Sequence, residues 1–240
     1  MKGLATLKSA APRSFQVNPA RKLSVQAPQK CAPSVKHRCS ANLLTNLFAK
    51  KSSAESPKQE LLDLCEAIPN NGVNSDDELK EEVLEMVASL EDFNPNKKPA
   101  SRDAKRGALD GLWELAFTTN DGSSAGKLGP FVGYVTQEVN VGGEKYKNNV
   151  EFGPLKLCLT ANWEVLGDTK WKVVFEDVVI SLFNIQLTRK EFPPDRFGIW
   201  RMTYADDDVR VLWTSSPNSE TGKESLFVLT KVTDELPTLG

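Results

Sequence analysis

Histidine is nearly absent from the sequence: the 240 residues contain one, His37. Ser-His-Asp and Cys-His catalysis and His-ligated zinc sites all need this side chain, so residues 38–240 offer none of them. Cysteine is scarce too. The four residues Cys31, Cys39, Cys65 and Cys158 include no C-x-x-C pair, which fits a compartment where thiols stay reduced. We therefore expect no metal and no other cofactor.

Long hydrophobic runs are also missing. The apolar segment of most interest, residues 178–183, has six residues and includes Ser181. A membrane-spanning helix needs about 18 consecutive apolar residues. A helical integral membrane protein is excluded, whereas binding at a membrane surface is not. The length allows one domain, or at most two small ones.

Acidic residues are missing from residues 1–54, which carry ten Lys or Arg. Such a basic, Ser-rich start without an apolar core of about 7–15 residues is typical of an organelle transit peptide. The excess of Lys over Arg and the abundant Ser and Pro favour the chloroplast over the mitochondrion. We predict that residues 1–40 are a chloroplast transit peptide, removed near Cys39, and that residues 41–55 form a flexible mature N-terminus.

The alternative for this basic start is an arm that binds nucleic acid. The whole chain has 30 basic and 32 acidic residues, so residues 55–240 hold 20 basic against 32 acidic ones. An acidic domain is a poor match for a phosphate backbone, and we expect no nucleic-acid partner.

Residues 56–106 are predicted to form two short helices and a linker. The first helix has capping signals at Ser56 and Pro57 and is expected to end near Pro69. The second begins with a capping box at residues 75–78 and is followed by a polar linker from Asn94. Its apolar positions recur at helical spacing on one face: Leu79, Val83, Leu84, Met86, Val87 and Leu90.

From Gly107 onward the hydrophobic period changes to two, which is typical of strands. A turn is predicted at Gly167-Asp168-Thr169 and another at Asp206-Asp207-Asp208. On three of these strands, alternate residues are expected to face inward. They are Leu109, Gly111, Trp113, Leu115 and Phe117, then every second residue from Leu155 to Val165, and then Trp171, Val173, Phe175 and Val179. Six more strands are expected at residues 132–141, 148–152, 180–187, 197–204, 208–213 and 225–232. The prediction is a mainly β (α+β) fold, with an antiparallel barrel or sandwich over residues 107–240.

Two sets of motifs carry a family resemblance. Gly111-Leu112-Trp113 is a G-x-W element on the first long strand, as in lipocalin-like barrels, and Arg210 on a late strand is placed to pair with Trp113. A longer ordered set is similar to the plastid-lipid-associated protein (fibrillin, plastoglobulin) family from Ser56 to Lys231. Its pieces are Leu90-Glu91, Asn94-Pro95, and residues 109–115, 137–140, 149–150, 161–164, 171–176, 203–210 and 226–229.

This resemblance implies a lipocalin-like antiparallel β-barrel preceded by two short N-terminal helices. It also implies residence in chloroplasts, at plastoglobules, thylakoids or stroma. The implied role is non-catalytic binding or organisation of apolar lipids such as prenylquinones, carotenoids or acyl lipids. Gly111, Trp113 and Arg210 would then form a structural barrel end. The polar segment of residues 214–223 departs from the family, which closes its last hairpin with a shorter turn.

The residues expected to contact a ligand are apolar side chains that face the interior of the predicted barrel: Trp163, Trp171, Phe175, Leu157 and Leu159. The same residues suit plain core packing equally well. Peripheral attachment to a membrane or lipid-body surface would be hydrophobic, through residues such as Leu128, Phe131 and Phe183, because the domain is acidic.

Two alternatives remain open at this point. An enzyme acting on a lipid or quinone would need acid–base groups inside the barrel, for which Asp177 and Tyr204 are candidates. We expect Asp177 to lie instead at a strand end in water. An interaction module that docks on a plastid enzyme or photosynthetic complex would show an exposed apolar patch on the helix of residues 79–90. No catalytic residue is assigned.

Overall fold

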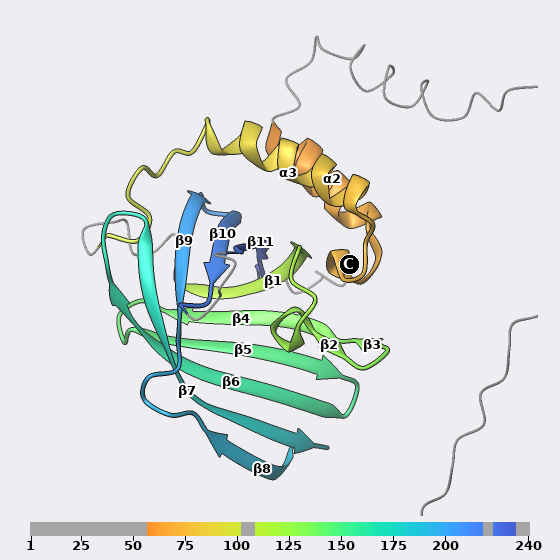
Figure 1. Cartoon of the computed structure of the whole chain (residues 1–240), viewed down its shortest axis with the longest axis vertical. Helices are drawn as coiled ribbons and strands as arrows, with labels where there is room; N and C mark the ends of the chain where they lie inside the picture. Colours follow the sequence, from red (N-terminus) through yellow and green to blue (C-terminus); the bar gives the residue numbers. More distant parts are fainter. Residues whose placement is uncertain (1–56, 102–108, 218–222, 234–240) are drawn as a thin grey trace, which may run out of the picture. The chain divides into compact units, whose positions relative to one another are not determined.

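The computed structural model describes residues 57–101, 109–217 and 223–233 (Figure 1). The predicted transit peptide, the flexible segment 41–55 and His37 lie outside these ranges, as do parts of the linker and of the polar loop after Trp213. Of the helices in the described ranges, none is both long and apolar enough to cross a membrane.

Two helices precede the strands, as the sequence predicts. The second has Asp76 as its N-cap: the carboxylate accepts the N–H of Leu79 at 2.8 Å. Asp77 and Glu78 lie in the first turn, where the helix dipole favours acidic side chains. The elements are α2 (Pro57–Ala67), the short 3-10 helix η1 (Pro69–Gly72) and α3 (Asp77–Glu91).

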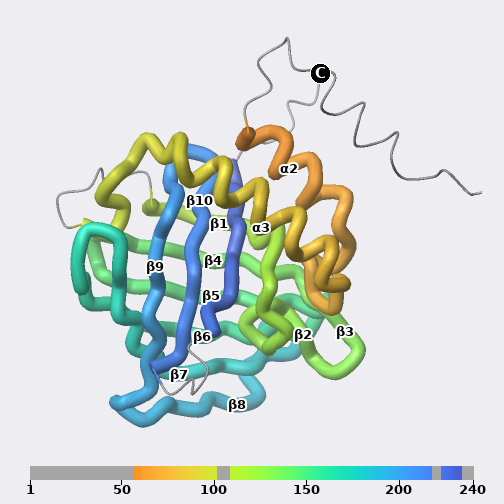
Figure 2. The backbone as a smooth tube through the Cα atoms, turned by 45° about the horizontal axis from the view of Figure 1, so that its top comes forward, coloured from red at the N-terminus to blue at the C-terminus, as the bar shows by residue number. Residues whose placement is uncertain are grey.

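The strands form one large antiparallel sheet, so the mainly β fold is confirmed. Eight strands pair in the cyclic order β6-β5-β4-β1-β11-β10-β9-β7, and β7 pairs back with β6 to close the ring. Figures 1 and 2 show β9 to β11 running across the direction of β4 to β7. Strand β8 pairs with β7 outside the ring, and β2 pairs with β3 alone. The bounds are β1 (Gly111–Thr118), β2 (Lys127–Leu128), β3 (Phe131–Val132), β4 (Tyr134–Asn140), β5 (Lys145–Phe152), β6 (Leu155–Val165), β7 (Lys170–Leu182), β8 (Ile185–Glu191), β9 (Phe197–Ala205), β10 (Val209–Ser215) and β11 (Ser225–Lys231), with a 3-10 turn η2 (Ser123–Ala125) before β2.

Helices α2 and α3 pack on the outer side of β1 and β9 to β11 (Figure 1). Leu61 of α2 and Val83 and Val87 of α3 are buried there against side chains of the sheet such as Val211 and Val228. The apolar face of α3 is therefore covered by its own sheet. The exposed patch that an interaction module would need on residues 79–90 is not found.

Two β-bulges change which side chains face the ring interior. Leu115 pairs with Leu229, but Phe117 pairs with Val228, so Phe117 turns toward the helices. The predicted inward parity is wrong at Phe117. In β7, Phe175 pairs with Ala161, and Asp177 with Thr160, which leaves Glu176 as the extra residue.

The bulge at Glu176 also changes the parity of the rest of β7. Beyond it, Val178 pairs with the inward-facing Leu159, and Val179 pairs with Cys158 on the outer face. The expectation that Val179 shares the face of Phe175 is therefore wrong.

The strand predicted at residues 180–187 is instead a hairpin. Phe183 and Asn184 connect β7 to β8 with φ values of 48° and 63°. Two successive positive φ values are what the favoured two-residue hairpin turn needs. Asn adopts this conformation readily and a bulky Phe does not, so the turn signal is weak in the sequence.

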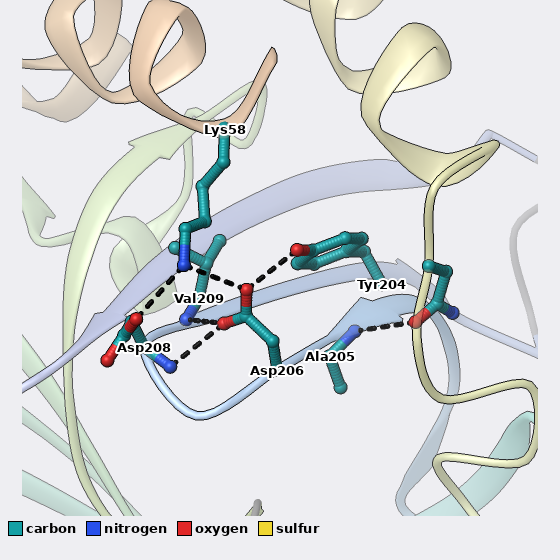
Figure 3. A network of polar contacts seen from close by, with 7 residues as sticks. Lys58, Tyr204, Ala205, Asp206, Asp208 and Val209 are labelled. Atoms are coloured by element: carbon teal, nitrogen blue, oxygen red, sulfur yellow. Dashed lines mark hydrogen bonds and ion pairs between the residues drawn. The ribbon is translucent and has the colours of Figure 1, made fainter. Parts of the chain in front are cut away.

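A partly buried polar cluster connects α2 to the turn between β9 and β10 (Figure 3). The Asp206 carboxylate accepts hydrogen bonds from Lys58 Nζ at 2.9 Å and from Tyr204 Oη at 2.7 Å. It also accepts the backbone N–H groups of Asp208 and Val209. Burial alone would raise the pKa of Asp206, but these hydrogen bonds together lower it below the ordinary value. The predicted turn at residues 206–208 is confirmed.

Replacing Asp206 by Ala should lower the free energy of unfolding by about 2 kcal/mol at pH 7, because it removes charge-assisted hydrogen bonds. A carboxyl whose folded pKa is depressed stabilises the fold above its unfolded pKa, and this contribution is lost as the pH falls through the folded pKa. Urea titrations should therefore show wild type and variant converging below about pH 3.9. The exposed neighbour variant Asp207→Ala should change stability by less than about 0.5 kcal/mol. An equal loss in both variants would contradict the assignment.

Candidate functional site

The inner face of β4 to β7 is organised in rows that the strand register fixes. One row joins Gln137, Asn148, Leu159 and Val178. The next row joins Val135, Val150, Leu157 and Ile180, and the last joins Phe152, Leu155 and Leu182 at the strand ends. The interior thus passes from polar side chains to purely apolar ones toward one end.

The opposite end of the ring is closed by packed aromatic rings. Trp163 and Trp171 stack with their ring centroids 4.3 Å apart and an interplanar angle of 7°. The indole N–H of Trp171 donates to the carbonyl of Ala100 at 2.9 Å. A gap of about 30 Å³ remains beside them, which is about the volume of one water molecule. Two of the five predicted ligand residues therefore pack against each other at this end of the interior.

The other three predicted ligand residues lie toward the less covered part of the interior. Leu157, Leu159 and Phe175 pack against the core but are only partly buried. Strand β7 pairs with β9 only through Lys170–Val174, and from Asp177 onward it pairs with β8. The distal halves of β6 and β7 therefore keep a partly accessible apolar inner face.

Exposed apolar side chains gather at the same end of these strands. Within the described residues, six of the nine large exposed hydrophobic side chains belong to this set, which we call the apolar rim: Leu128, Phe131, Tyr134, Phe183, Ile185 and Leu187. The register aligns Tyr134, at the start of β4, with the end of β5 and the start of β6. Exposed apolar side chains that gather at one end of a sheet can mark a binding site, so the rim is a candidate contact surface.

Phe183 stands out within the rim. Its side chain is 72% exposed, and its backbone has a φ of 48°. Its N–H donates to the carbonyl of Pro154 at 2.9 Å, which ties the β7–β8 turn to the β5–β6 turn. A bulky residue in the left-handed region costs of order 1 kcal/mol, and such strain clusters at functional sites. The turn holds an aromatic ring out from the end of the sheet.

The outer face of the same strands is polar and ion-paired. Lys147 pairs with Glu138 and Lys145 with Glu176, at 2.9 Å and 2.8 Å. Asp177 is buried on this face and accepts a hydrogen bond from Arg189 Nη2 at 2.7 Å. The expectation that Asp177 lies in water is wrong, because β8 and its arginine cover the carboxylate.

Neither candidate acid–base group faces the ring interior. Asp177 lies on the outer face, and Tyr204 belongs to the cluster under the helices, where it donates to Asp206. Burial, the hydrogen bond to Asp206 and the charges of Asp206 and Asp208 raise the pKa of Tyr204. Among the described residues, no three His, Cys, Asp or Glu side chains gather as metal ligands would.

Trp113 and Arg210 meet in the middle of the interior. Trp113 is fully buried and donates its indole N–H to the carbonyl of Leu109 at 3.0 Å. The Arg210 guanidinium lies 5.0 Å from the centroid of the Trp113 ring. At Gly111, where φ is +119°, an added Cβ would lie 3.2 Å from Cε of Lys231. Trp113 and Arg210 thus pack together in the core, whereas Gly111 is partly buried at the start of β1.

The apolar rim was only partly predictable. The sequence pointed to Leu128, Phe131 and Phe183, whereas Tyr134, Ile185 and Leu187 were missed. The available signal was the alternation of Ile185 and Leu187 after the apolar run of residues 178–183. Because one strand was predicted across residues 180–187, the turn that exposes Ile185 and Leu187 was not predicted.

These features define a class of protein: a closed antiparallel ring with N-terminal helices, packed aromatic rings at one end and an apolar rim at the other. The family model PAP_fibrillin matches residues 55–229, so the chain belongs to the plastid-lipid-associated protein (fibrillin) family. No solved structure matches the chain significantly.

Curated relatives agree with the family assignment. Light-induced proteins, chloroplastic, of Solanum demissum and Solanum tuberosum are each 31% identical over 140 residues, covering 54% of this chain and 41% of theirs. The chromoplast-specific carotenoid-associated protein C1, chromoplastic, of an Oncidium hybrid cultivar is 29% identical over 143 residues, covering 53% of this chain and 42% of its own. The matches span about two fifths of the length of these relatives. Their names support a plastid location for the chain.

Proposed function

We propose that this plastid protein binds apolar lipids without catalysing a reaction on them. The apolar rim contacts a membrane or lipid-body surface, and the partly accessible inner face of β6 and β7 receives an apolar chain. One observation carries the proposal: the exposed rim side chains and the partly buried inner leucines lie toward the same end of the sheet. A carotenoid-associated relative supports the ligand class.

The proposed contact is hydrophobic rather than electrostatic. Full burial of one large apolar side chain contributes about 1.5–3 kcal/mol, so partial burial of several rim side chains is enough for reversible attachment. Residues 55–240 carry 20 basic and 32 acidic residues, so an anionic surface would not attract them. Attachment should therefore survive high salt and yield to mild detergent.

Flotation with droplets of triacylglycerol coated by phosphatidylcholine tests this contact. The double variant Phe131→Asp/Phe183→Asp should reduce the bound fraction at least about tenfold, because two charges would have to enter the apolar layer. Phe93 is a matched control, since its side chain is 68% exposed and lies on the segment after α3, away from the rim. Phe93→Asp should bind like wild type.

Two results would count against the rim. Release of wild type by 1 M NaCl alone would indicate electrostatic attachment. An equal loss in the Phe93 control would show that any added surface charge weakens binding. Since both substituted positions are exposed, far-ultraviolet circular dichroism should show unchanged folding in every variant.

A further inference from the structure

Arg210 is a charged side chain inside the ring, and among the described residues it forms no ion pair with an acidic side chain. Its side chain is fully buried, and Nη2 donates a hydrogen bond to Oε1 of Gln137 at 2.6 Å. Within the described residues, Nε and Nη1 have no hydrogen-bond partner. Buried polar atoms without partners are rare and costly in folded proteins.

The surroundings of Arg210 do not balance its charge. The groups that face it are the Trp113 ring, Gln137 and the phenol of Tyr146. The ammonium group of Lys231 lies 5.3 Å from the same Trp113 ring. Burial lowers the pKa of Arg210 to about 10, so the guanidinium is still protonated at neutral pH. A buried cation of this kind is stabilised by an anion that brings hydrogen-bond acceptors.

The strand register connects this polar centre to the apolar inner face. Gln137 pairs with Asn148, which is next to Leu159 in the same row. From Leu159 the inner face continues through Leu157 to Leu155 at the strand ends. Four residues along a strand span about 13 Å. An extended chain can therefore lie on these leucines with one end at the polar row and the other at the apolar rim.

We propose that Arg210, together with Gln137, binds the carboxylate of a long-chain fatty acid whose chain lies along Leu159, Leu157 and Leu155. The carboxylate accepts the hydrogen bonds that Nε and Nη1 of Arg210 are able to donate. This inference rests on the proposed function, because it uses the same inner face, and it specifies the ligand class as a single-chain carboxylate rather than a neutral lipid.

Isothermal titration of the full chain with ligands of equal chain length tests the head-group preference. Dodecanoate should bind at least about tenfold more tightly than 1-dodecanol, and dodecyltrimethylammonium should bind no better than the alcohol. Equal affinity for dodecanoate and 1-dodecanol would overturn the carboxylate site and leave the proposed lipid binding intact. Failure of all three to bind would overturn both.

Two variants test whether Arg210 is the source of the preference for dodecanoate over 1-dodecanol. In Arg210→Met the advantage of dodecanoate over 1-dodecanol should disappear, because the donors are gone. Lys156→Met is the control, since Lys156 lies near the apolar rim and pairs with Glu151 at the surface; the advantage should remain. Loss of the preference in the Lys156 variant alone would overturn the proposal. If Arg210→Met fails to fold, the affinities of the wild-type chain for dodecanoate and 1-dodecanol still test the carboxylate site.

Discussion

Replacing Trp113 by Ala should lower the free energy of unfolding by about 3–5 kcal/mol. The side chain is fully buried in the inner core, and its indole N–H is bonded to the carbonyl of Leu109. The substitution leaves a cavity of aromatic size, an unpaired buried carbonyl and an Arg210 guanidinium without its aromatic neighbour. Each of these costs adds to the loss of apolar burial.

Urea denaturation followed by circular dichroism measures this change. Trp113→Phe should cost about 2 kcal/mol, because most of the volume is kept while the hydrogen bond is lost. Leu166→Ala is the control: Leu166 is 54% exposed on the β6–β7 connection, and the expected change is under about 0.5 kcal/mol. A Trp113→Ala variant as stable as the Leu166 control would show that the core around Trp113 is loosely packed.

The sequence predicted the elements better than it predicted their faces. The apolar spacing of the second helix and the turn at residues 167–169 are local signals, and both features are where they were expected. The helix is capped by Asp76 instead of by the predicted capping box that begins at Ser75. A β-bulge inserts one residue without any compositional mark, so the parity of Phe117 and that of Val179 were assigned to the wrong face. Closure of the ring through the β6–β7 pairing depends on strand curvature, which alternation does not encode.

The candidate site was predicted in part for a similar reason. The apolar parity of β6 correctly grouped Leu157, Leu159 and Trp163 on one face, since all three have inward-facing or core contacts. Periodicity cannot predict at which end of that face the aromatic rings pack together. The Trp171 indole N–H donates a hydrogen bond to the carbonyl of Ala100, which lies 71 residues away in the chain. Only the three-dimensional structure brings these two residues together.

Replacing Gly72 by Ala should destabilise the fold by about 3 kcal/mol. Gly72 has a φ of +82°, which costs about 1 kcal/mol for a residue with a Cβ. The new Cβ would also lie 2.6 Å from Cδ2 of Phe117 and 2.9 Å from the carbonyl oxygen of Thr118. Neither neighbour can retreat easily, because Phe117 is fully buried under the helices and Thr118 is part of β1. Overpacking of this kind adds about 1–3 kcal/mol.

A substitution at Gly129 measures the free-energy cost of the positive φ alone, without the cost of steric overlap. It also has a positive φ, of +59°, but an added Cβ there meets nothing within 4 Å. Gly129→Ala should therefore cost only about 1 kcal/mol, and the excess loss in Gly72→Ala measures how tightly η1 is pressed against β1. Equal losses for the two variants, measured by urea denaturation, would mean that the contact between Gly72 and Phe117 relaxes. The helical pair would then be held to the sheet mainly by the Lys58–Asp206 cluster and by the apolar face of α3.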